Sequence, residues 1–131
     1  MLSILDTSVL IGPGNHDIEG EIAISAVSVA GLQFGVLVTE DPDKRALRLG
    51  RLSALLQHFD PLPIDSRVAS SYGMLAAITH RNGRRSKARS LDLMIAATAH
   101  AHGPKLVTRN AADVEHLGSV LEIEVVELGH K

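Results

Sequence analysis

Short apolar runs alternate along the chain with longer segments whose apolar residues recur every three or four positions. The short runs lie at residues 2–6, 22–25, 105–108 and within 120–128, and they predict buried strands. Helical segments separate these strands, which favours a mainly parallel sheet flanked by helices on both faces. With 131 residues, the chain fits a single α/β domain spanning residues 1–131.

Capping residues and chain breakers set the expected helix limits. Ser25 or Ser28 caps a helix that runs to about residue 38, and Asp65 or Ser66 caps another that ends near residue 80. Further helices are predicted at residues 7–11, 44–58, 91–102 and 111–117. Aromatic residues make up only 2% of the chain, so the core must be aliphatic, with Phe34 and Phe59 expected inside it.

Three aspartates stand where strands end or helices begin. Asp6 ends the first predicted strand, Asp113 follows the strand that ends near Thr108, and Asp92 lies one residue inside an apolar helix start. Ligands of open parallel sheets bind beyond the carboxyl ends of the strands, so we expect these acids to meet at one edge. Taken singly, each acid has an alternative role as a helix cap or first-turn residue.

Acids gathered in one place repel one another unless a cation lies between them. Their hard oxygen ligands suit Mg²⁺, with Mn²⁺ as an alternative. A metal there activates water and orients a phosphate, which is phosphodiester-cleaving chemistry. Neutral groups that could support such a site follow the same strands: Thr7, Ser8, Thr108 and Asn110.

The net charge of −2 hides an uneven distribution of charge along the chain. Residues 44–89 hold ten basic and two acidic residues, whereas the remainder is strongly acidic. A polyanion such as RNA could bind the basic segment, although solvated helix faces would give the same pattern. The candidate RNA-binding residues cluster just before Asp92: Arg84, Arg85, Lys87 and Arg89.

The chain lacks cysteine, and its N-terminus lacks the basic region of a signal peptide. No segment approaches the roughly 18 apolar residues of a membrane span. We therefore expect a soluble cytoplasmic protein without a membrane partner.

Four stretches, spread in order over nearly the whole chain, resemble the PIN-domain ribonucleases and specifically the VapC toxins. They are LDTSVLI from Leu5, ISAVSVAGLQFGV from Ile24, SLDLMIAATAHAHG from Ser90 and LVTRNAADVEHL from Leu106. The resemblance implies a metal-dependent endoribonuclease, often dimeric, that cuts tRNA or ribosomal RNA and is inhibited by a VapB antitoxin. It also carries catalytic and metal-binding roles onto Asp6, Asp92 and Asp113.

One position departs from the family pattern. Where related toxins carry a glutamate on the second helix, this chain reads Ala30-Gly31-Leu32. Gly31 can be natural in an enzyme that works with three acids, natural in an inactive relative, or a detoxifying substitution, which we favour. It can also serve only to let helices pack closely. Glu40 lies too far along the helix to replace the missing acid.

Two other functions compete with RNA cleavage. A PIN fold weakened at Gly31 would bind RNA or an antitoxin without efficient cleavage. A response-regulator receiver is also α/β with an acid cluster, but it needs paired acids after the first strand and a lysine after a later one. Here only Asp6 ends the first strand, and Lys105 precedes its strand.

Overall fold

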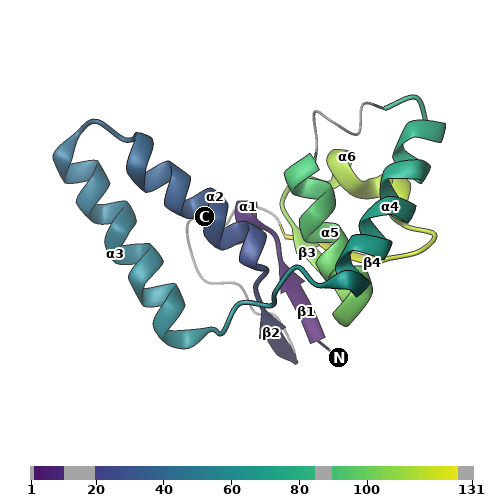
Figure 1. Cartoon of the computed structure of the whole chain (residues 1–131), viewed down its shortest axis with the longest axis horizontal. Helices are drawn as coiled ribbons and strands as arrows, with labels where there is room; N and C mark the ends of the chain where they lie inside the picture. The colour runs from purple at the N-terminus through teal and green to yellow at the C-terminus, as the bar shows by residue number, and fades with distance from the viewer. Residues whose placement is uncertain (1, 11–19, 85–89, 127–131) are drawn as a thin grey trace.

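The computed structural model describes residues 2–10, 20–84 and 90–126 (Figure 1). Its elements follow the order β1 (Leu2–Leu5), α1 (Thr7–Leu10), β2 (Glu21–Ala23), α2 (Ala26–Val38), α3 (Pro42–His58), α4 (Ser66–Arg81), α5 (Ser90–His102), β3 (Pro104–Thr108), α6 (Ala111–Val114), the 3-10 turn η2 (Glu115–Leu117) and β4 (Glu122–Val125). The strands and helices thus lie where the hydrophobic pattern predicts them, with shifts of a few residues at their ends.

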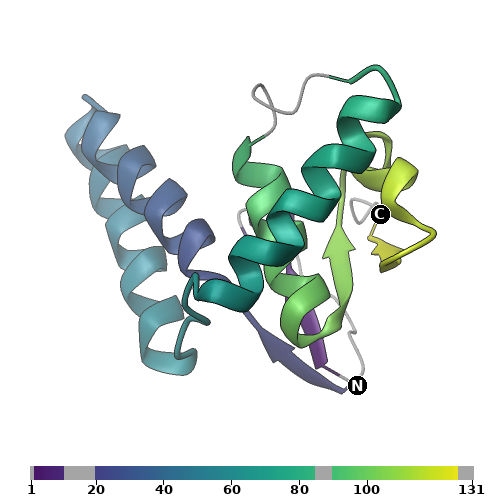
Figure 2. The same cartoon turned by 45° about the vertical axis from the view of Figure 1, so that its right-hand side comes forward.

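Over the described residues the sheet has four strands in the order β2-β1-β3-β4, and every neighbouring pair is parallel. The predicted parallel α/β fold is therefore confirmed. In the register of the central pair, Ile4 lies opposite Leu106 and Leu5 opposite Val107. Both strands end at the same edge, where α1 follows β1 (Figure 1) and α6 follows β3 (Figure 2).

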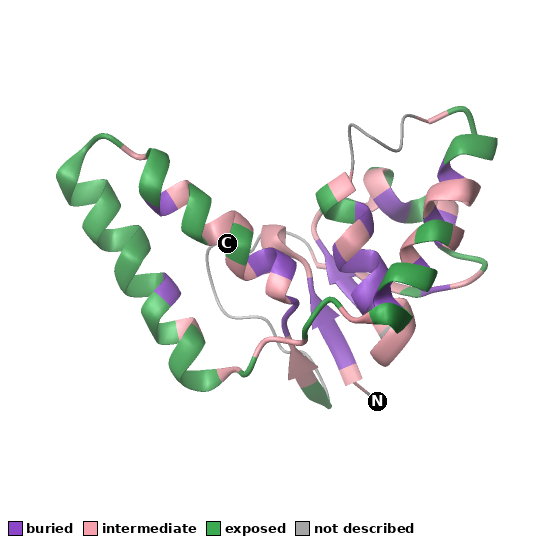
Figure 3. Ribbon diagram, in the orientation of Figure 1, coloured by how far each residue is buried: buried purple, intermediate pink, exposed green. Residues whose placement is uncertain are grey.

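Alternation along β1 and β3 divides the core between the two faces of the sheet. Ile4 and Leu106 belong to the larger cluster, which α4 and α5 cover. Leu5 and Val107 point to the opposite face, where they pack with Val9 of α1. Burial is accordingly densest in the central strands and α5 (Figure 3).

Side-chain caps fix the starts of three helices, and those at Ser25 and Asp65 are among the predicted candidates. The backbone N–H of Val27 donates to Ser25 at 3.0 Å, and that of Asp43 donates to Asp41 at 2.9 Å. Asp65 caps α4 in the same way. Ser25 is fully buried and its hydroxyl also pairs with that of Thr98 on α5 at 3.1 Å, so this cap ties α2 to the core.

The helices α2 and α3 form a hairpin that projects from one edge of the sheet (Figures 1 and 3). The expectation that Phe34 lies in the core is wrong, because its side chain is 68% exposed. Phe59 is only half-buried. The two helices pack against each other. Among the described helices and strands, none covers the outward face of this hairpin (Figure 1). In α3 only Leu52 is buried, although its leucines recur at helical spacing. No helix in residues 2–10, 20–84 and 90–126 has the length and hydropathy to cross a membrane.

The cap of α4 predicts a pH-dependent stability. The backbone N–H of Val68 donates to Asp65 at 3.0 Å and lowers the pKa of that carboxyl below 3.8, with His102 and Arg67 adding to the effect. A lowered folded-state pKa gives stability that is present above the unfolded-state pKa and lost as the pH falls through the folded-state value.

We expect Asp65→Asn to unfold at a lower urea concentration than the wild type at pH 7, and the difference to vanish at acidic pH. Asp60→Asn, an exposed loop acid, serves as control; a difference independent of pH would contradict the cap.

Candidate functional site

Asp6 occupies the first position after β1, and its backbone N–H continues the ladder by donating to the Val107 carbonyl at 2.8 Å. Both of its carboxylate oxygens accept hydrogen bonds. Oδ1 accepts from the backbone N–H of Thr7 at 2.8 Å, and Oδ2 accepts from the hydroxyls of Ser8 at 2.9 Å and Thr108 at 2.7 Å. With donors on both oxygens, the carboxylate is held in one orientation.

The two hydroxyls that hold Asp6 are themselves held by the turn after β3. The backbone N–H of Arg109 donates to the Ser8 hydroxyl at 3.1 Å, and that of Asn110 donates to the Thr108 hydroxyl at 3.0 Å. Each hydroxyl thus accepts one hydrogen bond from a backbone N–H and donates one to the Asp6 carboxylate. Such chains of hydrogen bonds polarise one another. The predicted supporting positions Ser8 and Thr108 therefore contact Asp6 directly.

The other two supporting positions act differently. The Thr7 hydroxyl donates to the hydroxyl of Ser28 on α2 at 3.1 Å, which fixes α2 beside α1. Asn110 precedes α6 without a side-chain cap, and its carbonyl accepts from the backbone N–H of Asp113 at 3.1 Å.

Asp92 and Asp113 both lie in the first turn of a helix, α5 and α6 respectively. Because α5 runs back along the sheet before β3 begins, its first turn lies toward the edge where β1 and β3 end (Figure 2). Asp92 is exposed and Asp113 half-buried. Over the described residues, no three acidic or histidine side chains are grouped closely enough to hold a metal ion by themselves.

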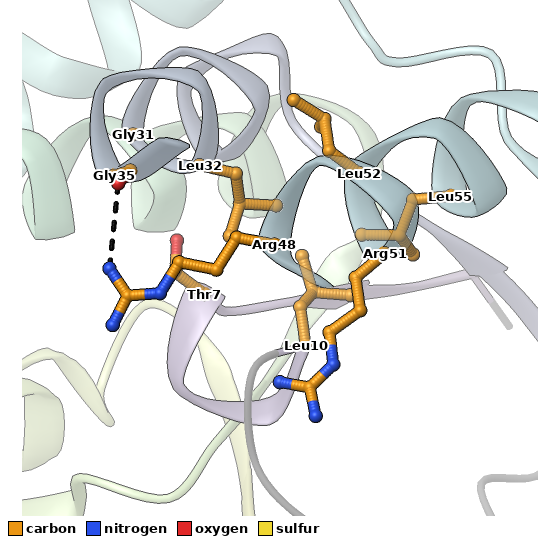
Figure 4. Close-up of a pocket in the computed structure, with 9 residues that line it drawn as sticks. All are labelled: Thr7, Leu10, Gly31, Leu32, Gly35, Arg48, Arg51, Leu52 and Leu55. Carbon is orange, nitrogen blue, oxygen red and sulfur yellow. Dashed lines mark hydrogen bonds between the residues drawn. The ribbon is translucent and has the colours of Figure 1, made fainter. Parts of the chain in front are cut away.

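Gly31 lies in the middle of α2 and lines a pocket of about 350 Å³ (Figure 4). A Cβ atom at this position would meet nothing within 4 Å, so the interpretation that Gly31 serves close helix packing is wrong. Thr7 lines the same pocket and directly follows Asp6 in the chain. A side chain at position 31 would therefore enter open space next to the residue that follows Asp6.

Sequence reasoning missed two arginines in the same pocket. Arg48 and Arg51 of α3 line it together with Leu10, Leu32, Gly35, Leu52 and Leu55. The sequence does indicate that both arginines share a helix face with Leu52 and Leu55, because residues three and four apart are neighbours on a helix. It does not indicate that this face lines a pocket. Arg48 donates to the Thr39 hydroxyl at 2.8 Å and to the Gly35 carbonyl at 3.4 Å, near the end of α2.

The basic segment after α4 is described only at its start. Arg84 is half-buried and donates from its guanidinium to the carbonyl of Ala112 at 2.8 Å, one residue before Asp113. This bond attaches the start of the segment to α6. The other candidates for RNA binding there, Arg85, Lys87 and Arg89, lie outside the described residues.

Comparison with known proteins gives a consistent match. The PIN domain family matches residues 3–117. Ribonuclease VapC4 of Mycobacterium tuberculosis is 32% identical over 82% of this chain and 85% of its own length, and Ribonuclease VapC5 of the same organism is 30% identical over 95% and 94%. The crystal structure of the toxin–antitoxin system VapBC-5 from M. tuberculosis superposes with a TM-score of 0.81 at 31% identity, covering 97% of this chain and 98% of that chain.

The open space at Gly31 predicts that the glycine costs stability. Gly31→Ala should raise the free energy of unfolding by about 1 kcal/mol, because alanine is the better helix former and meets no neighbour. Urea unfolding followed by circular dichroism measures the change. Gly103→Ala is the matched control with the opposite sign, since its Cβ would lie 3.0 Å from the Leu2 carbonyl oxygen. Destabilisation by Gly31→Ala would show that the glycine is required for packing.

Proposed function

The chain belongs to the PIN-domain family, in its VapC group, and from this premise we propose that it is a ribonuclease toxin of a toxin–antitoxin pair. The observation that carries the proposal is the carboxylate of Asp6, oriented by donors on both of its oxygens at the edge where the central strands end. A carboxylate fixed in this way is suited to metal binding because its direction is set in advance.

Asp6, Asp92 and Asp113 are proposed to hold Mg²⁺ or Mn²⁺, which would supply an activated water and neutralise charge on the phosphate. The donor set fits such an ion, since Mg²⁺ takes oxygen ligands, keeps several waters and often uses only one or two protein carboxylates. Asp6 would be the direct ligand, and the exposed Asp92 and half-buried Asp113 would act through water. Ser8 and Thr108 orient Asp6.

A weaker function also has an observation in its favour. The pocket wall at Gly31 carries no carboxylate, although the resemblance to the VapC toxins leads us to expect one there, and a Cβ at this position would meet no neighbour. We therefore propose attenuated cleavage for this sequence, with a PIN module that binds RNA or antitoxin without efficient cleavage as the second candidate. The open space at position 31 leaves room for a larger side chain, which supports our interpretation of Gly31 as a detoxifying substitution.

The partners follow from the same comparison. The VapBC-5 structure is described as a toxin–antitoxin system, and we propose a VapB-type antitoxin for this chain. Cleavage of tRNA or ribosomal RNA, a homodimeric state and a cytoplasmic location stay predictions. The extent of the PIN domain over all of residues 1–131 is likewise a prediction.

Purified protein should cleave RNA in Mg²⁺, and EDTA or Asp6→Asn should reduce cleavage to background. Thr108→Val should lower activity roughly tenfold, because it removes a hydrogen bond that orients Asp6 without removing a carboxylate. Cleavage rates on a labelled RNA measure both effects. Asp41→Asn is the control for Asp6→Asn, because it replaces the aspartate that caps α3 by asparagine, and it should leave the cleavage rate unchanged. Cleavage that persists in Asp6→Asn would rule out this site.

Restoring an acid at position 31 should strengthen the site. We expect Gly31→Glu to raise both Mn²⁺ affinity, measured by calorimetry, and the rate of RNA cleavage, because the new carboxylate enters open space beside Thr7. Gly31→Gln matches it in size without the charge and should change neither. Equal metal binding and equal cleavage in all three proteins would contradict a role for this position.

A further inference from the structure

One face of α3 forms a wall of the pocket beside Gly31. Arg48, Arg51, Leu52 and Leu55 share this face. The Arg48 side chain extends toward Gly35 of α2, and the Arg51 side chain extends past Leu10 of α1 (Figure 4). Residues three apart on a helix have Cβ atoms about 5–6 Å apart. Both guanidinium groups can therefore contact one extended ligand.

Within residues 2–10, 20–84 and 90–126, no acidic side chain pairs with Arg48 or Arg51. Arg48 donates only to neutral oxygens, those of Thr39 and Gly35. Among the described residues, ion pairs are found at Asp65 with His102 and at Lys105 with Glu122 and Glu124, and none involves α3. Two unneutralised guanidinium groups beside a hollow favour an anionic ligand.

The hollow extends further along α3. A second depression of about 330 Å³ shares Leu10, Arg51 and Leu55 with the first, and continues to His58 and Phe59. Together they form a groove, which runs from Gly31 and Thr7 past Arg51 to His58. One end of the groove therefore lies beside the residue that follows Asp6.

We propose that this groove binds the phosphodiester backbone of the RNA next to the cleavage site, with Arg48 and Arg51 on its phosphates. The apolar floor, which includes Leu10 and Leu55, would lie under sugars and base faces. The choice of RNA as ligand rests on the proposed function; the cationic, mixed polar and apolar lining is what the groove itself contributes. Backbone contacts of this kind position the strand without reading its sequence.

Binding without cleavage tests the groove. The full-length protein is titrated in EDTA against a short fluorescein-labelled single-stranded RNA, with anisotropy read at several KCl concentrations. Arg51→Gln should weaken binding about fivefold at low salt, the upper range for one exposed ion pair. It should also reduce the slope of log K against log salt by about 0.7. We chose Arg51 for the test because Arg48 also holds the end of α2 through its hydrogen bonds to Gly35 and Thr39.

Matched variants separate charge from structure. Arg45→Gln lies on the same helix and removes a bond to the Thr39 carbonyl, but Arg45 does not line the groove, so RNA affinity should stay unchanged. In EDTA, Gly31→Glu should weaken binding more than Gly31→Gln, because the two side chains are alike in size and only the former places negative charge beside the arginines.

Equal affinity and equal salt slope in Arg51→Gln and Arg45→Gln would overturn the proposal. So would an Arg51→Gln protein that binds RNA normally but loses affinity for its antitoxin, since the groove would then belong to the protein partner. A cleavage assay in Mg²⁺ distinguishes failure of the RNA-binding groove from failure of the proposed nuclease function. Metal-dependent cleavage without any effect of Arg51 on binding removes only the groove, whereas arginine-dependent binding without cleavage removes only the nuclease.

Discussion

The carboxylate of Asp6 is held by two adjacent strands at once, and the site depends on that constraint. Its backbone extends the ladder between β1 and β3, while its side chain accepts from Thr108 at the end of β3. The amides of Arg109 and Asn110 then fix the hydroxyls that hold the acid. An error in strand register would misplace every one of these donors, because a shift of one residue reverses the direction of each side chain. The core that fixes the register therefore also sets the direction of the carboxylate.

Much of this arrangement could be predicted from residues alone. A polar residue directly after a buried run marks the edge of a parallel sheet, so Asp6, Ser8 and Thr108 could be assigned to one place before any coordinates. The helix caps at Ser25 and Asp65 were also among the predicted candidates, because capping depends on a few neighbouring residues. In each case the interaction is local, or is fixed by the parallel topology.

The α2–α3 hairpin shows where such reasoning fails. Leucines at helical spacing indicate an apolar face but not how much of it is covered, and here the exposure of Phe34 and most of α3 depends on how far the hairpin extends from the sheet. The pocket beside Gly31 escaped for the same reason. Arg48 and Arg51 lie far from Thr7 in sequence, and only the packing of α3 against α2 brings them into one lining.

Position 31 stands between two electrostatic demands. A carboxylate there would add a ligand at the metal edge, but it would also face the arginines of α3 and compete with a phosphate for them. Coulomb interactions between neighbouring charges are stronger where solvent is partly excluded. Without the carboxylate, the pocket keeps its positive charge, while the proposed metal site has one ligand fewer. If the proposed nuclease site and the proposed RNA groove both exist, a glycine at position 31 would favour holding RNA over cleaving it, because it weakens the metal edge and leaves the arginines of the groove without a neighbouring negative charge.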